Sequence, residues 1–196
     1  MRRIFRPQLP RRLLLYLEKK QREVDSGGNV SNLWRQARST RAMKQAFGIL
    51  ASMGGGRQRC MFCEDSRGVV IDHFWPKDAY PERTFVWENL ILSCAGRNRA
   101  KQRSFQLDTD GHPLLVDPTR EDPWEHLFFD SRTGILTARF LSKTGQVDPR
   151  GHYTVEISGL PLNHQAITEG RLRTYRNLAR CAQRFLEIVR IQNVPA

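Results

Sequence analysis

The sequence predicts an α+β protein in which a short strand pair and a helix form a central unit between helical segments. Apolar residues recur at helical spacing near both ends of the 196-residue chain. In the middle of the chain, the β-branched run at residues 69–71 favours a strand. Three consecutive glycines at residues 54–56 cannot continue a helix without a large entropic cost, so they are expected to connect the N-terminal helices to the central unit.

Two helices are predicted before this glycine connector. The first is expected to end at the turn formed by residues 26–28. The second is expected over residues 30–50 with Ser31 as its cap, unless Ser39 and Thr40 interrupt it.

The pattern of residues changes after residue 105. Prolines separate short apolar stretches, which predict short strands and turns at residues 114–116, 127–129, 135–140 and 153–157. A final helix carries apolar residues at helical spacing over residues 172–189. We expect these residues to form a buried stripe that docks on the N-terminal helices.

Three regions follow from this division. Residues 1–56 form an N-terminal helical arm, residues 57–106 form the central unit, and residues 107–196 complete the same compact unit with strands, turns and helices.

Residues with catalytic chemistry follow one another in the central unit. Strands at residues 60–64 and 68–72 would meet at a turn and present Asp72 and His73 at a strand end. A helix is expected to begin at Asn98, with Lys101 on the same face three residues later. In chain order the set is Cys60, Cys63, Asp72, His73, Asn89, Cys94, Asn98 and Lys101.

This ordered set resembles an HNH endonuclease domain, in the variant whose third signature residue is asparagine, here Asn98. The resemblance covers residues 60–105. It implies a ββα-metal (His-Me finger) nuclease core with the N-terminal and C-terminal helices packed around it. It also implies a metal-dependent endonuclease, since a strand pair presents a carboxylate and an imidazole while the helix presents a second metal ligand and a cation.

The residue types fit that chemistry. Phosphodiester hydrolysis must activate water and offset charge on the phosphate and the leaving oxygen. His73 suits the general base, because a neutral imidazole accepts a proton near pH 7. Asp72 and Asn98 offer oxygen ligands that favour Mg²⁺ or Mn²⁺. Asn89 is expected to hydrogen-bond the backbone on both sides and so orient the loop that carries His73. Lys101 is expected to steady the phosphate.

A second resemblance extends over nearly the whole chain. The strings DHFWPK at 72–77, YP at 80–81, VWENL at 86–90, VDP at 116–118 and DP at 122–123, with the start MRRI and Pro10, are similar to the HNH effectors of Septu-type and retron-associated anti-phage systems. This resemblance implies a bacterial defence nuclease that works beside an ATPase. In retron systems it implies a reverse transcriptase with its RNA–DNA hybrid as a further partner.

A structural zinc site is left open by the cysteine pattern. Many HNH proteins complete such a site with a second Cys-x-x-Cys, but here Cys94 is followed at the fourth ligand position by Arg97, which cannot ligate a metal. Cys60, Cys63 and Cys94 therefore supply three thiolates where structural zinc takes four ligands. Either an outside residue such as His112 completes the set, or packing has replaced the zinc.

The net charge is consistent with a nucleic-acid partner. The chain has 32 Lys and Arg against 20 Asp and Glu, a formal charge of +12, and such a chain attracts polyanions. Lys77, Arg97, Arg99 and Arg103 are predicted to contact nucleic acid. The arginines of the last helix (Arg171, Arg173, Arg176, Arg180 and Arg184) are equally explained by nucleic acid, by solvent or by an acidic partner subunit.

DNA is the expected substrate, and single-stranded or transfer RNA is accessible to the same metal chemistry, since no motif that reads base edges is recognisable. A noncatalytic nucleic-acid-binding or adaptor subunit of a defence complex is the alternative function, because the thiolate set is incomplete. We expect no membrane span and a cytoplasmic protein, since the chain lacks a long apolar run and its cysteine content does not indicate a disulfide scaffold.

Some residues with chemically reactive side chains are expected to be structural. Asp117, Asp122 and Asp130 stand next to prolines or turns, where aspartate usually accepts hydrogen bonds from backbone amides. No second metal-ligating residue stands at a spacing from His126 that would indicate a metal site. A surface or packing role is therefore expected for His126. Cys181 lies in a helical pattern and is expected to be a small buried apolar residue.

Overall fold

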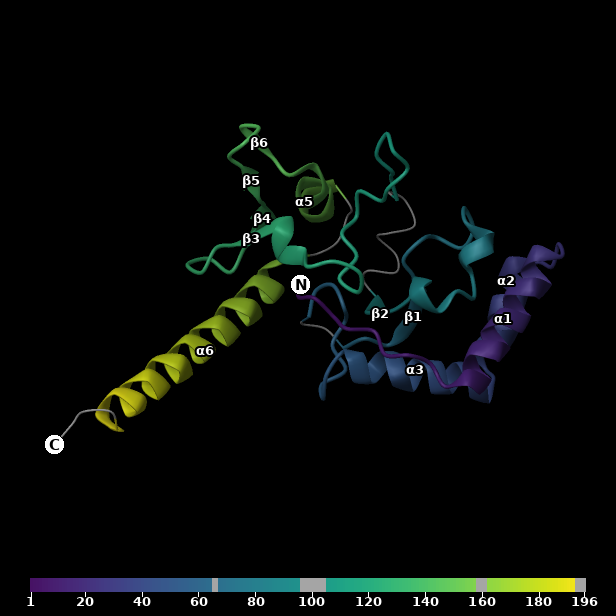
Figure 1. The fold of residues 1–196 in the computed structure, drawn as a ribbon, viewed down its shortest axis with the longest axis horizontal. Helices are drawn as coiled ribbons and strands as arrows, with labels where there is room; N and C mark the ends of the chain where they lie inside the picture. The colour runs from purple at the N-terminus through teal and green to yellow at the C-terminus, as the bar shows by residue number, and fades with distance from the viewer. Residues whose placement is uncertain (65–66, 96–104, 158–161, 193–196) are drawn as a thin grey trace.

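The computed structural model describes residues 1–64, 67–95, 105–157 and 162–192 (Figure 1). The N-terminal helices lie on one side of a central pair of strands. The later strands and the long last helix lie on the other side (Figure 1).

The N-terminal arm contains three helices: α1 (Arg11–Asp25), α2 (Val30–Arg38) and α3 (Arg41–Met53). The predicted second helix is divided in two because Thr40 Oγ1 accepts a hydrogen bond from Met43 N at 3.3 Å and so starts α3. The predicted cap Ser31 was wrong. Asn29 caps α2 instead, since its side-chain oxygen accepts a hydrogen bond from Asn32 N at 2.9 Å.

The central strands are β1 (Val70–His73) and β2 (Leu90–Ser93), which pair antiparallel with Asp72 opposite Ile91 and His73 opposite Leu90. Asp72 and His73 therefore end a strand, as predicted. The partner strand is β2 and not the predicted strand at residues 60–64. The prediction of a strand at residues 60–64 was wrong. Glu64 N donates to Cys60 O at 3.0 Å and Glu64 has a φ of 57°, so this segment closes a turn.

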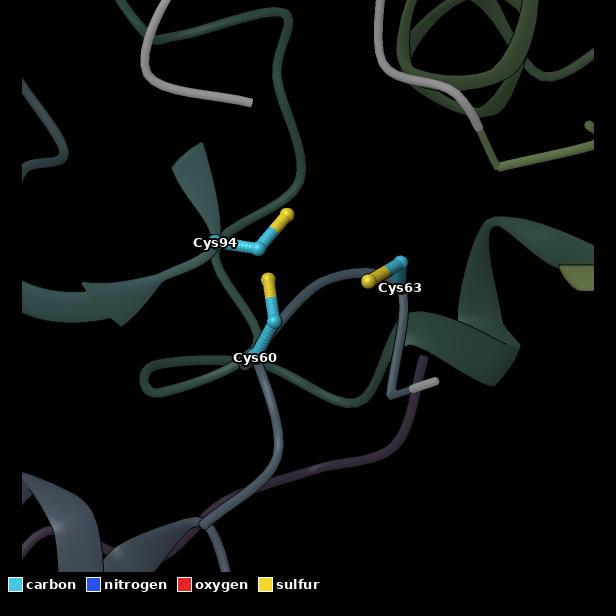
Figure 2. A group of neighbouring side chains, drawn as sticks. All are labelled: Cys60, Cys63 and Cys94. Atoms are coloured by element: carbon cyan, nitrogen blue, oxygen red, sulfur yellow. The ribbon is translucent and has the colours of Figure 1, made fainter. Parts of the chain in front are cut away.

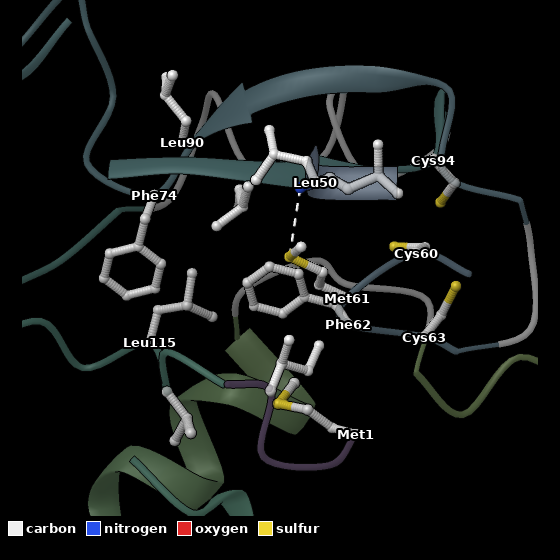
Figure 3. Packing of buried hydrophobic residues seen from close by; sticks show 14 of the residues in the cluster. Met1, Leu50, Cys60, Met61, Phe62, Cys63, Phe74, Leu90, Cys94 and Leu115 are labelled. Atoms are coloured by element: carbon white, nitrogen blue, oxygen red, sulfur yellow. Dashed lines mark hydrogen bonds between the residues drawn. The ribbon is translucent and has the colours of Figure 1, made fainter. Parts of the chain in front are cut away.

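The core lies between α3, the turn at residues 60–64 and β2 (Figure 3). Leu50, Met61, Phe62 and Leu90 are all buried there. Two hydrogen bonds join Met61 of this turn to Leu92 of β2. Met61 N donates to Leu92 O at 3.0 Å, and Leu92 N donates to Met61 Sδ at 3.4 Å (Figure 3). The turn that carries the first two cysteines is thus fixed to the strand that precedes Cys94.

The extended N-terminal segment connects the central strands to the C-terminal half. Ile4 N donates to Pro118 O at 2.7 Å. The Arg6 guanidinium donates to Trp87 O and Leu90 O, each at 2.9 Å. Burial lowers the pKa of Arg6, with nearby Asp117 acting in the opposite direction. These bonds fix the start of β2 from outside the strand pair.

The chain after residue 105 forms short elements. Strands lie within the ranges predicted at residues 127–129 and 135–140, but the strand predicted at residues 114–116 was wrong, since the pairing beside it is a single bridge between Leu107 and Pro113. Two antiparallel pairs are present: β3 (Leu127–Phe129) with β4 (Leu136–Ala138), and β5 (Phe140–Leu141) with β6 (Gln146–Val147). The strand predicted at residues 153–157 was wrong. Helix α5 (Pro149–His152) runs directly into a π-helical turn, Tyr153–Ile157. Asp148 starts this helical run by accepting a hydrogen bond from Gly151 N at 2.7 Å.

Helix α6 (Gln165–Gln192) extends away from the N-terminal helices (Figure 1). The predicted buried stripe is therefore wrong for most of this helix: Leu178 is 65% exposed and Phe185 is 64% exposed. Cys181, predicted to be buried, is exposed as well. Helical spacing shows that a helix has an apolar face, but it does not show whether this chain covers that face. No helix in the described residues is long and apolar enough to cross a membrane.

The three aspartates predicted to cap turns do so. Asp117 accepts hydrogen bonds from the Thr119 amide and hydroxyl, each at 2.8 Å. Asp122 accepts from Trp124 N at 3.1 Å and Asp130 from Arg132 N at 2.9 Å, as turn aspartates commonly do.

His126 is at the centre of an ionic network. Its Nε2 lies 3.1 Å from Glu121 Oε2 and its Nδ1 lies 3.1 Å from Asp148 Oδ1. Arg150 donates to both oxygens of Glu121, at 2.5 and 2.6 Å. Although burial opposes it, hydrogen bonds from His126 and Arg150 lower the pKa of Glu121 to about 2. The Glu121 bond raises the pKa of His126. His126 is thus structural, as expected, but it is paired with two carboxylates.

The raised pKa of His126 predicts a pH-dependent stability. Its contribution is fully present below about pH 6.5, the value of an unperturbed histidine, and is lost as pH rises through the raised folded value. We expect His126→Gln to lower Tm by roughly 3 °C or more at about pH 5.5, and by less at about pH 8.5. Thermal unfolding followed by circular dichroism measures this. The control is the exposed His152→Gln, and a loss of Tm for His126→Gln that is independent of pH would contradict the assignment.

Candidate active site and metal centre

Asp72 and His73 lie on the wall of a cavity of about 380 Å³ between the end of β1 and helix α2. Lys77, predicted to contact nucleic acid, lines the same cavity. The opposite wall includes Arg35 and Arg38 of α2. Sequence reasoning missed these two arginines, because α2 is more than thirty residues away in sequence and no motif links it to β1.

A hydrogen bond and a ring contact help to fix the orientation of His73. His73 is 5% exposed, and its Nε2 lies 2.9 Å from the Thr84 carbonyl oxygen. The Trp34 ring meets the imidazole edge-on, with 4.3 Å between ring centroids. A carbonyl can only accept, so Nε2 must carry the proton. In the neutral imidazole the basic lone pair is then on Nδ1, the nitrogen suited to accept a proton.

Asn89 holds the loop that connects β1 to β2. Its Oδ1 accepts from Trp75 N at 2.7 Å, and its Nδ2 donates to Trp75 O at 3.1 Å and to Arg83 O at 2.8 Å. These are backbone contacts on both sides of the loop, as predicted for Asn89. Because Arg83 directly precedes Thr84, the same amide positions the carbonyl that orients His73.

Asp72 is also positioned by the backbone. It is 9% exposed, and its Oδ1 accepts a hydrogen bond from His73 N at 2.8 Å. A carboxylate on the wall of a cavity is a suitable oxygen ligand for Mg²⁺ or Mn²⁺. The second predicted ligand, Asn98, lies outside the described residues. So do Lys101 and the predicted nucleic-acid contacts Arg97, Arg99 and Arg103, and these remain predictions.

The side chains of Cys60, Cys63 and Cys94 point toward one another (Figure 2). Their three sulfur atoms all lie within 4.8 Å of one another, and all three residues are buried. This spacing is compatible with one thiophilic ion, since a zinc–sulfur bond is about 2.3 Å long. The turn at residues 60–64 supplies two of the sulfurs, and the end of β2 supplies the third.

A second group of candidate metal ligands contains Asp108, Asp110 and His112. Within it, Asp108 Oδ1 accepts hydrogen bonds from the backbone amides of Asp110 and His112, at 3.0 and 2.8 Å. His112 therefore belongs to this exposed turn and does not join the three cysteines. The suggestion that His112 completes the thiolate set was wrong.

Comparison with known proteins finds two similar Septu proteins, although no family model matches the chain. It is 31% identical over 83 residues to Septu protein PtuB of Bacillus thuringiensis, an alignment that covers 40% of this chain and 31% of the relative. It is 28% identical over 160 residues to Septu protein PtuB of Bacillus mycoides, covering 66% of this chain and 50% of the relative. The chain is therefore similar to Septu PtuB proteins over part of its length.

This similarity confirms the Septu part of the resemblance seen in the sequence. The matched segments span between about a third and a half of the length of these relatives. The association with retron systems stays a prediction.

The Asn89 contacts predict a large loss of stability when its amide is removed. Asn89→Ala removes three hydrogen bonds from a buried side chain, so we expect the free energy of unfolding to fall by about 3 kcal/mol. Asn89→Asp keeps the shape but loses both donated bonds, and should also destabilise. Urea unfolding measures both. The control Asn177→Ala, on the exposed surface of α6, should change stability by less than about 0.5 kcal/mol. Equal effects of the three substitutions would contradict the role given to Asn89.

Proposed function

We propose that this protein is a metal-dependent HNH endonuclease that hydrolyses phosphodiester bonds in nucleic acid, with DNA as the favoured substrate. The observation that carries the proposal is the position of His73 beside Asp72 on the wall of one cavity, with His73 Nε2 held 2.9 Å from the Thr84 carbonyl oxygen. An imidazole whose Nε2 proton is donated to the Thr84 carbonyl, at 2.9 Å, directs its basicity to Nδ1.

In the proposed reaction, His73 Nδ1 accepts the proton of the attacking water as the water oxygen bonds to phosphorus and the bond between phosphorus and the 3′ oxygen breaks. Asp72, with Asn98 as second ligand, would hold Mg²⁺ or Mn²⁺. When bound, that ion supplies positive charge at the phosphate and at the leaving 3′ oxygen. The donor set fits a hard cation, because the described candidate ligand is a carboxylate. Lys101 would contact the same phosphate.

The cations around the cavity support a polyanionic substrate. Arg35 and Arg38 approach from α2, and Lys77 approaches from the loop after β1. The Arg35 guanidinium donates to Asn32 Oδ1 at 2.8 Å, and Lys77 Nζ lies 3.4 Å from Ser31 Oγ and 2.5 Å from Asp78 Oδ1. Cations placed on both sides of a carboxylate and an imidazole can engage the phosphates that flank the cleaved bond.

The similarity to Septu PtuB proteins supports a biological role. We propose that the protein is an effector of an anti-phage defence system, as its similarity to Septu PtuB proteins indicates. An ATPase is the proposed partner in such a system, and a reverse transcriptase with its RNA–DNA hybrid is a further proposed partner.

The nuclease proposal is tested by removing the base. We expect His73→Ala to reduce Mg²⁺-dependent cleavage of DNA or RNA by about 10²–10⁴-fold, the usual contribution of a general base, while nucleic-acid binding is retained. Cleavage is assayed with and without the ATPase, and the exposed His152→Ala serves as the control. If the wild type and His73→Ala cleave equally, His73 is not the base. If the wild type binds nucleic acid but never cleaves it, even with the ATPase, the noncatalytic adaptor function is supported instead.

The converging thiols support a second metal. We propose that Cys60, Cys63 and Cys94 hold a structural Zn²⁺, with its fourth ligand supplied by a group other than cysteine. Elemental analysis of the purified protein should find stoichiometric zinc that Cys60→Ser loses and Cys181→Ser retains. Cys181 is the matched control because it is exposed on α6. Wild-type protein without zinc would show that packing alone holds the three cysteines together.

A further inference from the structure

A second and larger cavity, of about 700 Å³, lies where the first residues, the segment 57–64 and the start of α6 meet. It shares none of its lining residues with the cavity that contains His73. The proposed nuclease chemistry makes no use of it. Its size is within the range of cavities that bind small ligands.

Positive charge dominates the lining of this cavity. The cationic side chains are those of Arg2, Arg57, Arg59, Arg171 and Arg173, against one carboxylate, Glu64. Glu64 is already neutralised, since its oxygens lie 2.9 Å from the amino group of Met1 and 2.9 Å from Arg2 Nε. Arg171 is held in place by donating to Gly134 O at 2.5 Å and to Leu162 O at 2.8 Å. The cavity therefore favours an anion.

Aromatic rings line the same cavity. Trp124 is 38% exposed and Tyr175 is 42% exposed, and Tyr175 is supported by Phe129, with ring centroids 5.2 Å apart. Exposed aromatic rings beside arginines offer a stacking surface next to phosphate ligands, which is the combination that binds an unpaired base and its phosphate. An acidic peptide would use the arginines but would have no comparable use for the rings.

The arginines continue beyond the cavity along α6. Arg173, Arg176, Arg180 and Arg184 are all exposed and are spaced three, four and four residues apart, so they lie on one face of the helix. At about 1.5 Å per residue they cover roughly 16 Å, which is more than one nucleotide can span. This arginine track points to an extended strand instead of a free nucleotide.

We propose that this cavity and the arginine track of α6 form a binding site for single-stranded nucleic acid, separate from the cleavage site. Bases stack on Tyr175 and Trp124, and the phosphates follow the arginine track. This site does not depend on the proposed nuclease activity, because binding requires neither His73 nor a divalent metal.

Fluorescence anisotropy with a labelled 15-nucleotide single strand, as DNA and as RNA, tests the site in EDTA, which prevents metal-dependent cleavage. We expect Tyr175→Leu to weaken binding about tenfold, since base stacking on an aromatic ring contributes about 1–3 kcal/mol. The double variant Arg173→Gln/Arg176→Gln should weaken binding and reduce the slope of log K against log salt by about 0.7 for each phosphate that the variant no longer neutralises. Arg22→Gln on α1, which is exposed and far from α6 in Figure 1, should bind like the wild type.

Three results would overturn the proposal. Unchanged binding by Tyr175→Leu would exclude stacking. Equally tight binding of a nucleoside monophosphate would indicate a free-nucleotide site. Displacement of the strand by polyglutamate at an equal concentration of charge would indicate a site for an acidic protein. Circular dichroism confirms that each variant is folded. Crosslinking of a 4-thiouridine-labelled strand to Trp124 or Tyr175 in the wild-type protein provides support that does not depend on any variant.

Discussion

The candidate active site depends on the side-chain amide of Asn89. The sixteen residues between β1 and β2 contain only short 3-10 turns, so their backbone lacks the regular hydrogen bonds of a sheet or a long helix. Asn89 makes three hydrogen bonds within this loop, and Arg6 donates to Trp87 O in the loop and to Leu90 O at the start of β2. Because Thr84 follows Arg83, these contacts place the carbonyl that selects the His73 tautomer. The properties of the imidazole thus follow from a chain of hydrogen bonds that begins outside β1.

The molecule offers two chemically distinct environments for metal ions. The cavity at the end of β1 presents a carboxylate and is surrounded by arginine and lysine side chains, which suits a hard cation and its phosphate ligand. The cluster of Cys60, Cys63 and Cys94 is buried and presents sulfur, which suits a thiophilic ion. The two environments share β1–β2 as their support, since β1 carries Asp72 and His73 while Cys94 follows β2. Their different ligand chemistry would keep the proposed catalytic ion and the proposed structural ion apart.

Helix α6 differs from the N-terminal helices because most of its apolar residues are exposed. In α1, α2 and α3 the buried apolar residues join one core with β2. In α6 only the first turns are anchored, through Ile167 and Thr168, and the later apolar residues are exposed together with the arginines. Exposed apolar and cationic residues on a single helix are typical of a surface that contacts another molecule. The cavity at the start of α6 adds arginine side chains and aromatic rings to that surface.

The sequence alone determined the features that depend on neighbouring residues. It predicted the end of α1, the position of Asp72 and His73 at the end of a strand, and the backbone contacts of Asn89, because periodicity, capping and side-chain chemistry act over a few residues. It predicted one helix over residues 30–50 and named Ser39 and Thr40 only as residues that could interrupt it. Tertiary structure decided which segments meet. It paired β1 with β2 instead of with residues 60–64, placed Arg35 and Arg38 opposite His73, brought Cys94 to Cys60 and Cys63, and left α6 exposed. These contacts join residues that are far apart in the chain, and their free energy comes from burial and shape, which no local pattern of residues encodes.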